Sequence, residues 1–264
     1  MKKSPSVRRF GRMAGLSLVE LMIAMTLGLV TVGAVGYIYL GTSKTYRTQY
    51  ALARLQEGAR YAFEVISSDI RMAGATGCAY STATNVITDY EDVWFANLFE
   101  QPLVAEDANG GSGTVTEFSD ALRTVRADVS REYVVQVHNT GGVVTFPAAH
   151  DITAGALMLA TDCNHAAVFQ VETASGTQIT YGATGTPGNA TTNLGASGAY
   201  EFLQGSRLYK LAASTYYVDT NPAGEPALYR MRPVGAAATA TPEELIEGVE
   251  DFQVTFGVDT NEIG

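Results

Sequence analysis

The stretch Leu16–Leu40, LSLVELMIAMTLGLVTVGAVGYIYL, decides the fold class of this chain. Glu20 is its only charged residue. As an α-helix rising ~1.5 Å per residue, the stretch would be roughly 37 Å long, enough to cross the ~30 Å hydrocarbon layer of a bilayer. A secretory signal peptide normally has an apolar region of only about 7–15 residues. The length therefore predicts a helix that stays in the membrane rather than a signal peptide that is lost.

A basic leader precedes this stretch. The first 15 residues contain five basic side chains and no acidic one: Lys2, Lys3, Arg8, Arg9 and Arg12. Clustered positive charge keeps a segment on the cytoplasmic side of a membrane. We therefore expect a single pass with the N-terminus in the cytoplasm, and residues beyond about 41 in the periplasm or outside the cell.

The charge balance excludes one class of partner. The chain has 17 Lys and Arg residues against 27 Asp and Glu residues, a formal charge of −10. Because five of the basic residues lie in the leader, the rest of the chain is more acidic still. Such a surface repels a phosphate backbone, so we expect no nucleic-acid binding.

Glu20 is the unusual residue of the apolar stretch. A carboxylate inside a membrane segment costs about 2.5–3.5 kcal/mol on insertion scales, and a functional partner is the default hypothesis for it. The alternative is a carboxylate that lies near the membrane surface and is simply hydrated.

The residues around Glu20 carry a family resemblance. Gly15–Ala24, GLSLVELMIA, resembles the type III signal of type IV pilins and type II secretion pseudopilins. The resemblance implies that a prepilin peptidase cuts between Gly15 and Leu16, that the new first residue is N-methylated, and that Glu20 becomes the fifth mature residue and acts in assembly. Leu16 stands where most major pilins have Phe, which favours a minor pilin.

The apolar pattern becomes one-sided over residues 41–74. A stripe at spacings of three and four predicts an amphipathic continuation of the helix that packs on a globular head. Its members are Leu52, Leu55, Ala59, Phe63, Ile66 and Ile70. Gly74 is the expected stop.

Further segments resemble the PilW family of minor pilins. They include Tyr46–Gln49, Leu52–Glu57, Asp69–Gly74, Thr161–Cys163, Asn221–Pro226 and Leu245–Asp251. The resemblance implies an α+β pilin-like fold, with a long N-terminal helix on a mainly antiparallel β-sheet. We expect a cleaved leader at 1–15, a transmembrane or filament-core helix at 16–40, its amphipathic half at 41–74 and a β-rich head at 75–264. PilW-like chains usually continue further, so the head is interpreted as C-terminally truncated.

Short apolar runs predict the strands of the head. They are Arg131–His138, Leu157–Ala160, Ala167–Glu172, Gln178–Tyr181, Leu208–Val218, Ala227–Met231 and a half-buried strand at Val249–Val258. The turn-rich segment Asp219–Pro226 predicts a hairpin. Asn109–Gly113 and Gly182–Gly198, rich in small residues, are expected to be mobile loops.

The resemblance also implies the function. A minor pilin is a low-abundance subunit that primes assembly of the type IV pilus, the filament of twitching motility and cell adhesion, and lies at or near its tip. The implied partners are other minor pilins, the major pilin, the prepilin peptidase, the inner-membrane assembly platform and a large tip adhesin. The protein would move from the inner membrane to the pilus at the cell surface. The alternatives are a J-type pseudopilin of type II secretion and a membrane-anchored periplasmic enzyme or binding protein.

Cys78 and Cys163 are too few and too far apart for a zinc finger. Cys78 follows the amphipathic helix and Cys163 follows an apolar strand. In an oxidising compartment we expect a disulfide between them, with two free buried thiols as the alternative. Asp162, Cys163 and His165 together could hold zinc, but the disulfide would remove the thiolate, so we expect no metal site.

The sequence offers little catalytic chemistry. It contains no nucleophile elbow, zinc-protease motif, phosphate loop or dinucleotide fingerprint. We interpret Asp89–Asp92, Glu243, Glu244 and Glu247 as solvated faces, and His165 as a solvated loop histidine. A calcium loop starting near Asp259 is a weaker alternative. The sequence therefore predicts a protein that is not an enzyme and carries no cofactor.

Overall fold

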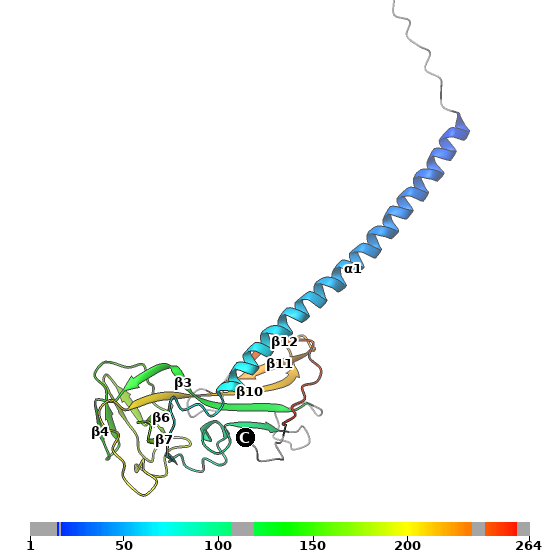
Figure 1. Cartoon of the computed structure of the whole chain (residues 1–264). Helices are drawn as coiled ribbons and strands as arrows, with labels where there is room; N and C mark the ends of the chain where they lie inside the picture. Colours follow the sequence, from blue (N-terminus) through cyan, green and yellow to red (C-terminus); the bar gives the residue numbers. More distant parts are fainter. Residues whose placement is uncertain (1–14, 16, 107–118, 234–240, 258–264) are drawn as a thin grey trace, which may run out of the picture. The chain divides into compact units, whose positions relative to one another are not determined.

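The computed structural model describes residue 15 and residues 17–106, 119–233 and 241–257 (Figure 1). The chain divides into two units, Met1–Arg54 and Leu55–Gly264. Residues 1–14 of the leader, Leu16, Asn109–Gly113 and Asp259 lie outside the described residues.

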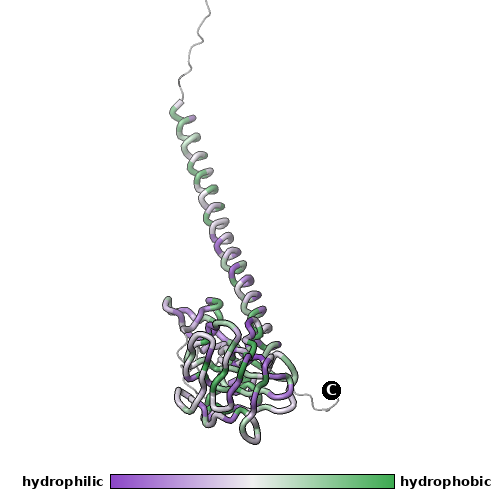
Figure 2. The backbone as a smooth tube through the Cα atoms, turned by 90° about the vertical axis from the view of Figure 1, so that its left-hand side faces the viewer, coloured by the Kyte–Doolittle hydropathy of each residue, from purple (hydrophilic) through white to green (hydrophobic). Residues whose placement is uncertain are grey.

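One helix, α1 (Leu18–Met72), runs from the first unit into the second. No proline interrupts this stretch, so each backbone N–H can bond within the helix. Gly74, at φ +75°, follows its end in the left-handed conformation typical of a helix stop. Along the tube of Figure 2, hydrophobic residues dominate the start of α1 and hydrophilic residues become frequent farther along.

The second unit is built on two sheets. Within the described residues, the larger sheet has eight strands: β1 (Thr82–Asn85), β7 (His165–Gln170), β6 (Leu157–Thr161), β10 (Arg207–Thr220), β11 (Pro226–Met231) and β12 (Glu243–Glu247) in that order, with β3 (Ala121–Val134) beside β10 and β2 (Leu103–Glu106) beside β3. All its pairs are antiparallel except β1 with β7. The smaller sheet contains β4 (Val137–Asn139), β5 (Val143–Thr145), β9 (Gln178–Thr180) and β8 (Thr173–Ser175).

The predicted α+β class, a long helix with a mainly antiparallel sheet, is confirmed. Strand β10 is the centre of the head and pairs with β3, β6 and β11 (Figure 1). Side chains alternate between the two faces of a strand. One face packs against the end of α1 near β11 and against the smaller sheet near β6 and β7. The other face packs against the segment around a short 3₁₀ helix, η1 (Trp94–Ala96).

The predicted hairpin after β10 is confirmed, because β10 and β11 pair across the turn from Asp219 to Pro226. Asn221 organises this turn. Its side-chain oxygen accepts hydrogen bonds from the backbone N–H groups of Ala223 and Glu225, each at 3.0 Å. An asparagine that bonds its own following backbone is a frequent reason for a turn.

Two strand predictions are wrong. Arg131–His138 is not one strand, since β3 ends at Val134 and β4 begins at Val137. Residues 249–257 are not a regular strand either. The backbone there bonds to side chains instead: the N–H of Phe252 donates to Ser119 Oγ at 3.0 Å, and that of Val254 to Asp120 Oδ2 at 2.8 Å. Strand β12, just before it, was not predicted.

The segment Gly182–Gly198 is not the simple loop expected from its small residues. Asn189 and Leu194 are both buried within it. Asn189 Oδ1 accepts a hydrogen bond from the N–H of Gln170 on β7 at 2.6 Å, and Asn189 Nδ2 donates one to the carbonyl of the same residue at 2.9 Å. These paired bonds fasten the segment to β7.

Candidate functional site

The start of α1 carries the residues that the sequence singled out. Ser17 precedes the helix, and its carbonyl accepts the first helical hydrogen bond, from Leu21 N–H at 3.1 Å. Glu20 Oε2 accepts a hydrogen bond from Ser17 N–H at 3.0 Å. Gly15 is exposed, with no neighbouring atom within 4 Å of the position a Cβ would take.

The Ser17–Glu20 contact is half of a capping box, in which the side chain of the third helical residue bonds the N–H before the helix. The carboxylate also lies at the positive end of the helix dipole. Glu20 is therefore placed to stabilise the start of its own helix. Ser17-x-x-Glu20 was the signal in the sequence for this contact, which the sequence argument overlooked.

Beyond Glu20 the helix presents large apolar side chains. Met22, Met25, Leu29 and Ile38 are among those that are exposed. Among the described residues, α1 is the helix long and apolar enough to cross a membrane. Such a surface requires lipid or other protein around it, because exposed apolar area of this extent is unfavourable in water.

The last part of α1 attaches to the sheet by a narrow stripe. Ala62 and Ile66 pack with Val218, Leu228 and Ile246 of β10, β11 and β12. A Cβ added to Gly58 would lie 3.3 Å from Ile246 Cγ2, so the helix approaches β12 closely there.

The stripe predicted to face the head is only partly correct, because Ile66 is the member of it that packs with the core of the head. The contacts use Gly58, Ala62, Ile66 and Asp69, a face rotated by about one-sixth of a turn from the predicted one. Phe63 remains 73% exposed, and Leu52 and Ile70 are exposed as well. Gly58 and Ala62 occupy most of the contact with the sheet because small side chains allow the helix to approach it closely. Leu52, Leu55, Phe63 and Ile70 of the predicted stripe are therefore exposed.

Asp69 is the polar part of this attachment. Tyr216 donates a hydrogen bond to Asp69 Oδ2 at 2.6 Å, and Arg126 Nε lies 3.6 Å from Asp69 Oδ1. Asp69 and Tyr216 are both buried. Burial, followed by the hydrogen bond to Asp69, raises the pKa of the Tyr216 hydroxyl, so it remains a donor. The bond ties α1 to β10 with a defined geometry.

The two cysteines join the end of the helix to the sheet. Cys78 and Cys163 form a disulfide with Cα atoms 5.3 Å apart, the pair expected from the sequence. Cys163 lies in the turn between β6 and β7 at φ +67°. The disulfide thus links the segment after α1 to the centre of the head.

The residues considered as a zinc site stabilise this turn instead. The interpretation of His165 as a solvated loop histidine is wrong, because the residue is buried at the start of β7 with its Nε2 2.7 Å from the Leu194 carbonyl. Asp162 Oδ1 accepts hydrogen bonds from the N–H groups of Asn164 and His165, and Asp162 Oδ2 accepts one from Tyr200. Burial opposes ionisation of Asp162, but these bonds hold its pKa below the ordinary value. In the part of the chain that the structure describes, no three His, Cys, Asp or Glu side chains gather as metal ligands.

The other histidines lie apart from this turn. His138 is buried; its Nδ1 accepts a hydrogen bond from Phe202 N–H at 2.9 Å, and its Nε2 lies 2.7 Å from the Tyr181 hydroxyl. Burial lowers the pKa of His138. His150 Nε2 lies 3.1 Å from the carbonyl of Gln178. Both rings have structural partners.

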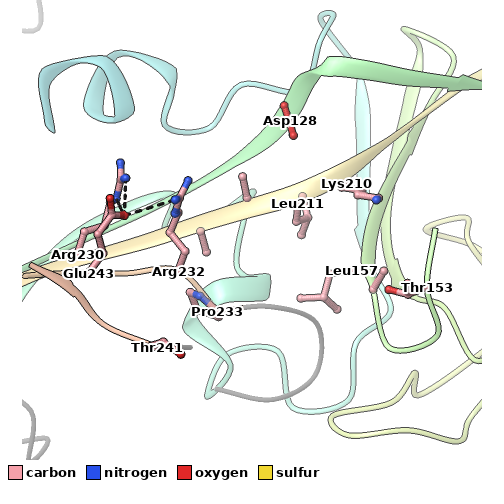
Figure 3. Close-up of a pocket in the computed structure, with 13 residues that line it drawn as sticks. Asp128, Thr153, Leu157, Lys210, Leu211, Arg230, Arg232, Pro233, Thr241 and Glu243 are labelled. Carbon is pink, nitrogen blue, oxygen red and sulfur yellow. Dashed lines mark hydrogen bonds and ion pairs between the residues drawn. The ribbon is translucent and has the colours of Figure 1, made fainter. Parts of the chain in front are cut away.

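A groove of about 570 Å³ opens in the larger sheet beside β10 (Figure 3). Arg230, Arg232 and Glu243 lie together at one side, and Leu157, Thr153 and Lys210 at the other, with Leu211 between them. Nothing in the sequence marked this groove, because it arises from the order in which distant strands pair.

A comparison with protein families matches the C-terminal part of the head. Residues 215–264, which include the end of β10 and strands β11 and β12, match the model of PilW, the type IV pilus-assembly protein W. The resemblance to the PilW family is confirmed. No curated protein and no solved structure matches the chain. The PilW match supports a protein related to type IV pilus assembly, and the apolar start of α1 fits a location in the membrane or the pilus.

Proposed function

We propose that this chain is a minor pilin, a low-abundance, non-catalytic subunit that primes assembly of the type IV pilus and lies at or near its tip. The main support for the proposal is the difference between the two ends of α1. The last part of the helix is attached to a PilW-like head. The first part exposes large apolar side chains, and Glu20 caps its start through a hydrogen bond from the Ser17 N–H. In a membrane this surface contacts lipid, and in a filament it contacts the helices of other subunits.

The proposal assigns two successive roles to Glu20. In the precursor, the carboxylate accepts the Ser17 N–H and stabilises the helix start. After cleavage between Gly15 and Leu16, the new amine offers a positive charge. In a filament core, an unpaired carboxylate is costly, whereas an ion pair with the amine of a neighbouring subunit offsets much of that cost. The carboxylate thereby favours one axial register between subunits.

The experiment compares the recovery of Glu20 variants in sheared pili, relative to their level in the membrane. We expect Glu20→Ala and Glu20→Gln to be inserted and largely processed but recovered about tenfold less than wild type, and Glu20→Asp to be intermediate. Ser17→Ala is the matched control, because it keeps the backbone N–H that Glu20 bonds and should assemble normally.

Equal recovery of Glu20→Ala and wild type would refute a role of this charge in assembly. A protein that never enters pili, but whose deletion stops type II secretion, would be a pseudopilin instead. A protein whose apolar helix can be exchanged for any other without loss of function would be a membrane-anchored binding protein.

A further inference from the structure

Strand β10 has a gap along one of its edges. On that edge β6 pairs with it as far as Lys210, and β11 pairs with it from Thr215 onward. Among the described residues, no strand lies opposite the stretch between them, and the groove of Figure 3 opens there. The opposite edge is occupied throughout this stretch by β3.

The backbone of Ala213 points into this gap. Ala213 lies opposite Val125 of β3, whose N–H bonds the carbonyl of Pro102 and whose carbonyl accepts the N–H of Gly74. Val125 therefore faces away from β10, and in an antiparallel pair the opposite residue then faces away as well. Ala213 is only 6% exposed. Among the described residues, no strand pairs with its N–H and C=O groups, an arrangement that favours a ligand with backbone groups of its own.

The carbonyl of Leu211 has the same direction. Leu211 lies opposite Ala127, whose N–H bonds the carbonyl of Ala75 and thus also points away from β10. The gap therefore offers the Leu211 carbonyl as an acceptor and the Ala213 N–H as a donor. A residue of a parallel strand that lies opposite Ala212 could use both groups: its N–H would donate to the Leu211 carbonyl, and its C=O would accept from the Ala213 N–H.

The gap is short enough to favour the end of a ligand chain over a strand that continues through it. The distance along β10 from Leu211 to Thr215 is roughly 13 Å at ~3.3 Å per residue. A strand that passed through would collide with β6 at one end and β11 at the other. A chain that enters from one face of the sheet and terminates in the gap avoids both.

The positive charge at the β11 end of the gap favours a carboxylate on the ligand. Glu243 Oε2 lies 2.7 Å from Arg230 Nη2 and 3.5 Å from Arg232 Nη2, so two guanidinium groups share one carboxylate oxygen. The hydrogen bond from Arg230 holds the pKa of Glu243 below its ordinary value, so Glu243 is ionised and one positive charge remains in excess. The side chain of Arg232 is 60% exposed and can reach a ligand.

At the β6 end the positive charge of Lys210 is already paired, since it contacts the carbonyl and the carboxylate of Asp151. The Asp128 carboxylate, which also lines the groove, accepts hydrogen bonds only from the neutral N–H and hydroxyl of Ser130, so its charge disfavours a ligand carboxylate at this end. A ligand carboxylate therefore gains more at the β11 end, beside Arg232.

We propose that this gap binds the C-terminal end of an extended peptide from a partner protein. The last residue lies parallel to β10 and opposite Ala212; its N–H donates to the Leu211 carbonyl, and its terminal carboxylate accepts the Ala213 N–H. The parallel direction carries that carboxylate toward β11 and Arg232, where a charge-assisted hydrogen bond forms. Strand addition at an edge and carboxylate capture are both known modes of peptide recognition. The binding is independent of the helix start, so its test is separate from that of pilus assembly.

The experiment uses the full chain in detergent, immobilised and exposed to a pool of random synthetic hexapeptides with free C-terminal carboxylates. The same pool with C-terminal amides is the comparison, and bound peptide is quantified by mass spectrometry. We expect the carboxylate pool to be retained at least about tenfold more than the amide pool. Arg232→Gln should remove most of this preference.

Arg207→Gln is the matched control. The Arg207 side chain is 47% exposed and pairs with Glu132, and neither residue lines the groove. It should retain the wild-type preference. Ala212→Trp, which adds a bulky side chain to the wall of the groove, should abolish retention, with circular dichroism to check folding. Equal retention of the two pools, or an equal effect of Arg232→Gln and Arg207→Gln, overturns the proposal even if Ala212→Trp does not fold.

Discussion

The two parts of α1 are one continuous helix, yet among the described residues only the last part is buried against the head. The last part buries Ala62 and Asp69 against the head, with β10, β11 and β12 as its partners. The first part leaves side chains such as Leu29 and Tyr37 largely exposed. A surface of that kind is satisfied by lipid or by other subunits. Attachment to the head thus uses mainly small and polar residues together with Ile66, whereas most large apolar side chains of the helix are exposed.

The largest effect should come from Gly15→Val, which should prevent the start of α1 from entering pili but leave the folding of the head unchanged. If the prepilin peptidase requires glycine before the cut, the variant keeps its 15-residue leader completely and enters no pili. The head should fold normally, because Gly15 contacts nothing. Mass spectrometry of membrane-extracted protein measures the leader. An intact leader on the wild-type protein in its host would contradict the processing that the proposed function requires.

Loss of the disulfide should be the largest effect on the head. Replacing Cys78 and Cys163 by serine should lower the free energy of unfolding by about 2–5 kcal/mol, because the bond closes a long loop and restricts the unfolded chain. Urea unfolding of the full chain in detergent measures it. The wild type with reductant should unfold like the double variant. Labelling of both thiols in non-reduced periplasmic protein would show that the disulfide does not form.

Removing the carboxylate of Asp69 should weaken the attachment by about 1–3 kcal/mol, because Asp69→Ala leaves the buried Tyr216 hydroxyl without its acceptor. Adding Tyr216→Phe should recover part of the loss, since the unpaired hydroxyl is then gone. Glu64→Ala, at an exposed site of the same helix, should change stability by less than about 0.5 kcal/mol. Equal effects of Asp69→Ala and Glu64→Ala in urea unfolding would contradict this role.

The smallest effect should come from Gly58→Ala, below about 1 kcal/mol. Alanine favours the helix by about 1 kcal/mol over glycine, but its Cβ would press on Ile246 at 3.3 Å. Gly58→Leu should destabilise the head clearly, because the larger side chain cannot fit. Gly41→Leu, at a position with no neighbour within 4 Å, should leave head unfolding unchanged. A neutral Gly58→Leu would show that the helix does not approach β12 closely.

The sequence by itself determined the long helix, its membrane-length apolar start and the hairpin of β10 and β11. These depend on local signals: an apolar run without proline, and a turn rich in Asn, Pro and Gly. The expected pairing of Cys78 with Cys163 also agrees with the tertiary structure, where the two Cα atoms come within 5.3 Å.

Only the tertiary structure decided which face of α1 meets the head. Counting apolar residues favoured the stripe with Phe63, but the contact uses Gly58, Ala62 and Asp69 because close approach and a buried hydrogen bond matter more there than side-chain size. The gap beside Ala213 also has no local signal. It exists because β6 and β11, more than sixty residues apart in the sequence, share one edge of β10 and stop short of each other.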